Sequence, residues 1–255
     1  MLRPLATHLT VLLTFGLVVT SDHAAGDDRT REQALRHYRQ GQAALNSERW
    51  GEAEEEFGIC TQLDPLLVAG HYGLGQTFMA TRRYPDAVRA YIEAENAFHE
   101  QQALVFTDSL AFQERLDDQI RALEDDLVSA QRQVSGQNAQ RIQAAVDRVE
   151  AQIQTLQTLR HRDTNEELPT PHWLSLALGG AYFRNENLPK AEEAYRAAVK
   201  VKSDLGEAHL NLSVVYMLTN RLDEAEQEVA LAEQSGIRVP QGLKDDIAKR
   251  KAGGS

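Results

Sequence analysis

Three histidines are the first candidates for chemistry in this chain: His37, His71 and His209. Imidazole nitrogen is a common zinc ligand, so the set suggests a metal site. His37 and His71, however, lie 34 residues apart, an interval at which other residues of the chain also recur. His209 has the same place in a later copy of this 34-residue pattern. Equivalent positions of stacked helical repeats are separated by about the width of a helical hairpin, too far for ligands of one ion. We therefore predict no metal site.

Other reactive side chains are equally isolated. Cys60 is the only cysteine, so no disulfide can form within the chain, and no base lies near it in sequence. We expect an inert, buried thiol. The run Gly73-Leu74-Gly75 lacks the third glycine of a dinucleotide site, and no P-loop, H-E-x-x-H, G-x-S-x-G or C-x-x-C motif is present. These observations predict no catalytic residue, no cofactor and no enzymatic activity.

Composition favours an all-α protein that does not bind nucleic acid. Only 6% of residues are aromatic, while Ala, Leu, Glu, Gln and Arg, which are good helix formers, are plentiful. The formal net charge is −11, whereas a phosphate-binding surface needs clustered Lys and Arg.

The N-terminus, residues 1–25, resembles an export signal. Arg3 supplies the positive start, and an apolar run of eleven residues follows from Leu9 to Val19, too short to span a bilayer comfortably. Cleavage is expected after Ser21 or Ala25, and the alternative is an uncleaved N-terminal anchor. No second apolar stretch of membrane-spanning length follows. We therefore expect an exported protein, periplasmic or secreted, with no integral membrane span after the signal is removed.

Small and aromatic residues recur at a fixed interval in the second half of the chain. The series Leu178, Gly179, Tyr182, Ala191, Tyr195 and Ala198 is followed 34 residues later by Leu212, Ser213, Tyr216, Ala225, Val229 and Ala232. An earlier series fits the same spacing: Leu74, Gly75, Phe78, Ala87, Tyr91 and Ala94. The pattern resembles the tetratricopeptide repeat. The resemblance implies an α-solenoid of helical hairpins, with repeats 1 and 2 in residues 34–100 and repeats 3 and 4 in residues 171–237.

The spacing has a physical reason that is independent of the family. Leu178 and Tyr182 are four residues apart and share one helix face, while Gly179 and Ala191 allow two helices to approach closely. Polar turn residues follow, and Pro189 suits the first turn of the next helix. A single hairpin cannot bury its apolar faces, so neighbouring hairpins must stack.

Between the two pairs of repeats, residues 104–161 carry a heptad pattern instead. Apolar residues step by four and three along two segments joined by a turn at Gly136: Leu116, Ile120, Leu123, Leu127, Ala130 and Val134, then Ile142, Val146, Val149, Ile153 and Leu156. This favours an antiparallel coiled-coil hairpin, with arms on the order of 40 Å long, that interrupts the solenoid. We expect it to project, and the alternative is that it fills the space of two repeats. Residues 162–170 form a linker, and 239–252 a capping helix.

The resemblance also implies that the first helix of each hairpin lines an inner surface. That surface is aromatic and thioether-rich, which suits an apolar or amphipathic peptide or a partner helix. Its inner positions correspond to Tyr38, Gln42, Tyr72, Gln76, Met79, Trp173, Leu176, Phe183, Leu210 and Met217. An alternative is that several of them pack against the inserted hairpin.

The sequence therefore predicts a non-catalytic scaffold for protein–protein interaction that binds a peptide or partner helix on the concave face of its repeats. The alternative is a structural protein that self-assembles, as a homodimer or larger homo-oligomer, through an intermolecular coiled coil.

Overall fold

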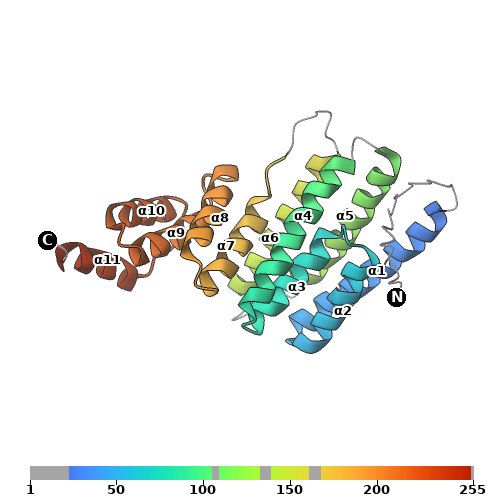
Figure 1. The fold of residues 1–255 in the computed structure, drawn as a ribbon, viewed down its shortest axis with the longest axis horizontal. Helices are drawn as coiled ribbons and strands as arrows, with labels where there is room; N and C mark the ends of the chain where they lie inside the picture. The colour runs from blue at the N-terminus through green and yellow to red at the C-terminus, as the bar shows by residue number, and fades with distance from the viewer. Residues whose placement is uncertain (1–22, 105–108, 133–138, 161–167, 254–255) are drawn as a thin grey trace, which may run out of the picture.

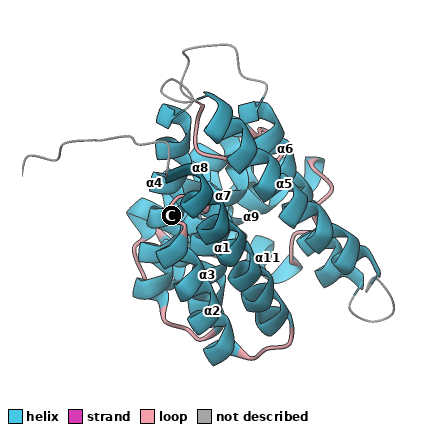
Figure 2. Cartoon of the chain, turned by 90° about the vertical axis from the view of Figure 1, so that its right-hand side faces the viewer, coloured by secondary structure: helices cyan, strands magenta, loops and turns pink. Residues whose placement is uncertain are grey.

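The computed structural model describes residues 23–104, 109–132, 139–160 and 168–253, so the predicted export signal, 1–25, lies almost entirely outside the described residues. Within the described part, the chain forms eleven α-helices. Figure 1 shows how they are arranged, and Figure 2 shows helices and loops and no strand among the described residues. The helices are α1 (His23–Asn46), α2 (Trp50–Leu63), α3 (Val68–Ala80), α4 (Tyr84–Leu104), α5 (Ser109–Arg132), α6 (Ala139–Arg160), α7 (His172–Arg184), α8 (Leu188–Val201), α9 (Gly206–Leu218), α10 (Leu222–Gln234) and α11 (Gln241–Gly253).

Four helical hairpins make up a continuous α-solenoid: α1–α2, α3–α4, α7–α8 and α9–α10. Within each pair of repeats, the second helix of one hairpin packs on the first helix of the next, as α2 does on α3 and α8 on α9. The same contact joins α4 to α7 across the insertion. The third hairpin therefore stacks directly on the second. The inserted segment follows α4 and ends before α7, which lies beside α4 (Figure 1).

Close helix approach explains why small residues recur. A Cβ added at Gly179 would lie 2.6 Å from Cδ1 of Tyr195, a ring that is only 2% exposed. Contacts that short do not occur between packed carbon atoms, so α7 and α8 can approach this closely only because the position is glycine. Gly73 meets the ring of Phe57 in the same way.

The turn inside each hairpin adopts one conformation four times. The residue two places after the first helix ends has a positive φ of 58–60° in every case, and it is never glycine: Glu48, Arg82, Glu186 and Asn220. The following residue closes the helix by donating its N–H to a carbonyl five positions earlier, as Asn187 does to Tyr182 at 2.9 Å. This geometry is a helix C-cap that usually favours glycine. In the third hairpin, the Asn187 side chain also caps α8 by accepting from the Lys190 N–H at 3.2 Å.

The two inserted helices, α5 and α6, pack on each other side by side. The heptad residues whose side chains are described and buried are Leu116, Ile120, Leu123, Val146, Ile153 and Leu156. Most of these belong to the same hydrophobic core as Tyr38, Tyr72 and Trp173 of the solenoid. The apolar stripes of α5 and α6 therefore face both each other and the repeats.

The expectation of a projecting arm was wrong, because α5 and α6 lie against α1, α4 and α7. Arg115 of α5 forms a partly buried ion pair with Asp64 at 2.5 Å, and Arg31 of α1 pairs with Asp118 at 3.4 Å. On α6, Thr155 accepts a hydrogen bond from Trp173 Nε1 at 3.3 Å. These contacts cover aromatic side chains on the repeats that would otherwise face water, which is the physical reason for the docking. The insertion also does not take the place of two repeats, since α4 and α7 are in contact.

The exit and return points of the insertion are tied by one side chain. The Gln102 amide donates to the carbonyl of Leu168 at 3.0 Å and accepts from its N–H at 2.5 Å, across 66 residues of sequence. A few residues away, Thr170 donates to Glu95 at 2.6 Å and lies 3.1 Å from Nε2 of His99. The chain thus rejoins the solenoid where it left it.

At the C-terminal end, α11 packs on α10 and buries Ile247, which is 1% exposed. Gly236, with a φ of 88°, follows the end of α10 and turns the chain. Arg250 donates to the carbonyl of Met217 at 3.1 Å. Across the described residues, no helix combines the length and the hydropathy that a membrane span requires.

Candidate functional site

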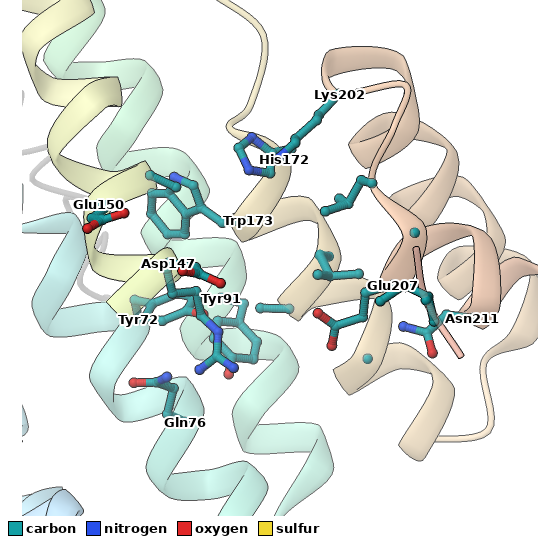
Figure 3. Close-up of a pocket in the computed structure, with 18 of the residues that line it drawn as sticks. Tyr72, Gln76, Tyr91, Asp147, Glu150, His172, Trp173, Lys202, Glu207 and Asn211 are labelled. Carbon is teal, nitrogen blue, oxygen red and sulfur yellow. The ribbon is translucent and has the colours of Figure 1, made fainter. Parts of the chain in front are cut away.

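A cleft of about 800 Å³ opens between α3, α6, α7 and the start of α9 (Figure 3). The solenoid lines most of it, and α6 of the inserted pair lines the remaining side. Its lining residues come from five helices and two connections: Tyr72, Gln76, Met79, Tyr91, Asp147, Arg148, Glu150, Ala151, Gln154, His172, Trp173, Leu176, Ala177, Gly180, Lys202, Leu205, Gly206, Glu207, Asn211, Ser235 and Ile237.

Three stacked aromatic rings form one wall of the cleft. The ring centroids of Tyr91 and Tyr72 lie 5.4 Å apart, and those of Tyr72 and Trp173 lie 5.1 Å apart, edge to face. The rings come from α4, α3 and α7. They therefore span the junction between the two pairs of repeats. Edge-to-face and tilted pairs of this kind stabilise packing, and the three side chains are only 3–6% exposed, so they border the cleft mainly with their edges.

A half-buried cation faces this wall. Arg148 of α6 has no ion pair and no hydrogen bond to any described residue. Burial raises the pKa of Tyr72, and the positive charge of Arg148 opposes that rise. The pKa of Tyr91 is raised well above its usual range by burial and by Tyr72, again with Arg148 acting in the opposite direction. The guanidinium therefore lies close enough to both phenols to influence their ionisation.

Other charged residues surround the cleft. Glu207, at the start of α9, acts on the pKa of Tyr72 in the direction opposite to Arg148. Asp147 accepts a hydrogen bond from the side-chain amide of Gln143 at 2.8 Å, and Glu150 is exposed. On the far side, burial and then the Lys202 ammonium lower the pKa of His172, so the neutral imidazole is favoured.

Half of the groove residues expected from sequence line this cleft: Tyr72, Gln76, Met79, Trp173 and Leu176. The structure places the other five elsewhere. Tyr38 is buried beneath α5, where its hydroxyl is hydrogen-bonded to Asp126. Gln42 donates to Asn46 on its own helix at 3.3 Å. Phe183 and Leu210 are partly buried against the core, and Met217 is buried. For Tyr38, the alternative of packing against the inserted hairpin holds.

The cleft also contains residues that sequence reasoning did not select. Five come from α6, namely Asp147, Arg148, Glu150, Ala151 and Gln154. The α6 residues flank the apolar positions of the second heptad series, and that flanking pattern was their only sequence signal. They were missed because a projecting arm would have carried them away from the repeats.

The histidines and the cysteine are structural. Nδ1 of His37 lies 2.7 Å from Glu56, and Nδ1 of His209 lies 2.6 Å from Glu228. Nε2 of His71 lies 2.9 Å from the carbonyl of Pro65. The imidazoles of His37 and His209 thus bond within their own hairpins, and that of His71 bonds to the connection that precedes its helix. The described residues contain no group of three or more side chains suited to hold a metal ion. Cys60 is buried, and burial raises the pKa of its thiol.

Comparison with known families follows the same division of the chain. A tetratricopeptide repeat model matches residues 38–100 and 176–240, the two pairs of hairpins on either side of the insertion. This chain belongs to the tetratricopeptide repeat family. Tetratricopeptide repeats generally mediate protein–protein interaction, and proteins of the family are generally non-catalytic scaffolds.

Several solved structures are similar to this tetratricopeptide repeat protein. The Pseudomonas aeruginosa pilF structure is 13% identical, with 88% of this chain and 90% of that chain covered and a TM-score of 0.34. TTC0263, a thermophilic tetratricopeptide repeat protein of Thermus thermophilus, is 18% identical, with 86% and 99% covered and a TM-score of 0.29. The MamA protein is 16% identical, with 80% and 92% covered and a TM-score of 0.29. No curated protein matches the sequence.

Proposed function

We propose that this protein is a scaffold that holds a peptide segment or short helix of a protein partner in the cleft between α3, α6, α7 and α9. One observation supports the proposal: a cleft of about 800 Å³ is lined by five of the ten residues that the sequence predicts for the binding groove. A cleft of this size matches the volumes of sites that bury a ligand of several residues. Its aromatic wall suits an apolar side chain, while Gln76 and Asn211 offer amides to a peptide backbone.

The proposed action is recognition without chemistry. Among the lining residues, no nucleophile is hydrogen-bonded to a base, and His172 and Ser235 share no hydrogen bond. Ser235 instead donates to the carbonyl of Ala232 at 2.7 Å, as a helix-end serine does. An acyl or phosphoryl transfer site requires a nucleophile and base in contact. The described lining of the cleft lacks that pair.

Blocking the cleft tests the proposal. Gly180 lines it, and a Cβ added there meets only the Tyr195 hydroxyl, at 3.9 Å, so a side chain can start at this position without a clash, and Gly180→Trp is designed to fill the cleft. Gly58, in the middle of α2 and outside the cleft, also has free space around it, and Gly58→Trp is the matched control. The full chain is immobilised and exposed to a random decapeptide library. Wild type and Gly58→Trp should retain peptides, and Gly180→Trp should lose about tenfold or more of that retention. Equal retention by all three would exclude the cleft.

Self-assembly through the coiled coil is the competing proposal from sequence, and no contact among the described residues favours it. The described seam residues, among them Leu116, Ile120 and Ile153, are already buried within the chain. For the place of action, we propose export, on the strength of the apolar run from Leu9 to Val19. Fusing residues 1–30 to a phosphatase that is active only after export tests this, with Leu12→Arg in the apolar run as the control that should abolish the signal.

A further inference from the structure

We infer that the segment held in the cleft carries an acidic side chain, Asp or Glu, which pairs with Arg148. This inference rests on the proposed function and adds the chemistry of the ligand to it. It starts from the position of Arg148 on α6, a helix of the insertion and not of the repeats. Recognition would therefore depend on a residue that the repeat pattern does not supply.

An unpaired guanidinium in a cleft is suited to bind an anion. Arg148 is half-buried and has no partner among the described residues. Taking a charge out of water without a counter-charge is unfavourable, and an added carboxylate removes that penalty. The planar guanidinium also matches a carboxylate with two parallel hydrogen bonds, which a hydrated lysine ammonium does not.

The groups around Arg148 suit the same ligand. The hydroxyls of Tyr72 and Tyr91 make no hydrogen bond to any described residue, and both phenols lie within the influence of Arg148. Each phenol can donate to a carboxylate held by the guanidinium. The edges of these two rings and of Trp173 border the cleft, where the methylene groups of a Glu side chain can contact them.

The acidic residues of the cleft do not already serve as the counter-ion. Asp147 and Glu150 are exposed, and Asp147 is engaged by Gln143. Glu207 is also exposed and forms no ion pair with Arg148 in the part of the chain that the structure describes. Exposed carboxylates are hydrated and need no partner, whereas the half-buried guanidinium is only partly hydrated. Glu207 nevertheless opposes an incoming anion, so its removal should strengthen binding. On the basic side, Lys202 adds attraction.

Position along the cleft favours an internal side chain over a chain terminus. Arg148 and Tyr72 both line the cleft, and other lining residues lie on either side of Tyr72. Figure 3 shows Gln76 below Tyr72, and Glu150 and Trp173 above it. A peptide can therefore pass on both sides of the contact, with one side chain turned to Arg148. A terminal carboxylate would instead require that the cleft end at this residue.

The experiment uses three decapeptide libraries that carry a fixed Glu, Gln or Lys at a central position, each prepared once with an amidated and once with a free C-terminus. For the immobilised full-length wild type, retention of the Glu library should exceed that of the Gln library about tenfold. Arg148→Gln should reduce this preference to none while total retention falls less than with Gly180→Trp. Arg148→Glu should shift the preference to the Lys library, and Glu207→Gln should increase the preference for Glu. Arg36→Gln, an exposed arginine on α1 outside the cleft, is the control and should behave as wild type.

Two outcomes overturn the inference and leave the proposed function intact. One is equal retention of the Glu and Gln libraries by a wild type that Gly180→Trp still disables. The other is a preference for free over amidated C-termini that does not depend on the fixed residue, since it would assign Arg148 to a terminal carboxylate. Loss of all retention, by contrast, would refute the proposed function. Thermal unfolding followed by circular dichroism confirms that each variant is folded before it is compared.

Discussion

Asp126 of α5 is in contact with Tyr38 of α1. We predict that the ionised carboxylate of Asp126 lowers the free energy of unfolding at neutral pH. The Tyr38 hydroxyl is hydrogen-bonded to Asp126, but Oδ2 of the carboxylate is buried without a partner among the described residues. Burial raises the pKa of Asp126 from 3.8 to about 6, against smaller effects of Tyr38 and Arg39 that lower it. The folded state therefore favours the protonated acid.

The direction of the pH effect follows from these two values. Because the folded pKa lies above the unfolded one, the stabilising contribution is complete below pH 3.8 and is lost as pH rises through about 6. A shift of about two pKa units corresponds to at most about 3 kcal/mol. Solvent around the partly exposed carboxylate reduces this to about 1–2 kcal/mol. Asp126→Asn removes the charge and keeps an oxygen that can accept from Tyr38, so it should stabilise the protein by that amount at pH 7.5 and by almost nothing at pH 4.

Urea unfolding followed at 222 nm, at half-unit steps from pH 4 to pH 8, measures the difference in unfolding free energy between wild type and Asp126→Asn. The control is Asp125→Asn, whose carboxylate is 74% exposed and faces Arg39 at 3.6 Å, and which should change stability by only a few tenths of a kcal/mol. A variant that is less stable than wild type at pH 7.5 would refute the reasoning. So would a stabilisation that is the same at pH 4. Either result would mean that the hydrogen bond from Tyr38 to the ionised acid outweighs its burial.

Three further predictions concern the repeats and the assembly. Glu186→Gly should raise the free energy of unfolding by about 0.5–1 kcal/mol, because Glu186 has a φ of 60° that strains a residue with a Cβ. Asn220→Gly, at the equivalent turn, should raise the free energy of unfolding by less. Chemical denaturation of both variants measures the two values. Gly179→Ala should lower the free energy of unfolding by about 1–3 kcal/mol, because the added Cβ would meet the Tyr195 ring. The neighbouring Gly180→Ala has free space for its Cβ and should be neutral or stabilising. Similar thermal midpoints for the two variants would contradict the packing argument. Light scattering of the full chain at several concentrations should give a monomer mass throughout, since the seam that includes Leu116 and Ile153 is covered internally; a mass that rises with concentration would support self-assembly.

The repeat period was enough to predict the solenoid, because each small or aromatic position makes the same local contact in every hairpin. Gly179 meeting Tyr195 is one such contact, and its partners are 16 residues apart. The heptads likewise predicted two apolar helices in the insertion. Both inferences rest on interactions between near neighbours in sequence, which periodicity records.

Docking of the insertion could not be read from the sequence in this way. The contacts that fix it include Arg115 with Asp64 and Arg31 with Asp118, polar pairs 51 and 87 residues apart that follow no period. Tyr38 had the position of a groove residue, and only the arrival of α5 turns it into a buried partner of Asp126. Arg148 became a candidate for the same reason, since a flanking position on a heptad helix acquires a role only when that helix has a neighbour.

The hydrogen bonds between Gln102 and Leu168 join the two ends of the inserted segment, which are 66 residues apart in sequence. Independently of them, α4 packs on α7. The architecture therefore separates two duties within one polypeptide. The hairpins set the shape of the stack. Their packing does not depend on the length of the segment inserted between α4 and α7. A longer, shorter or different inserted segment would change the side of the cleft that α6 forms and leave the side formed by the repeats unchanged. New ligand preferences can therefore arise here without a change in how the hairpins pack.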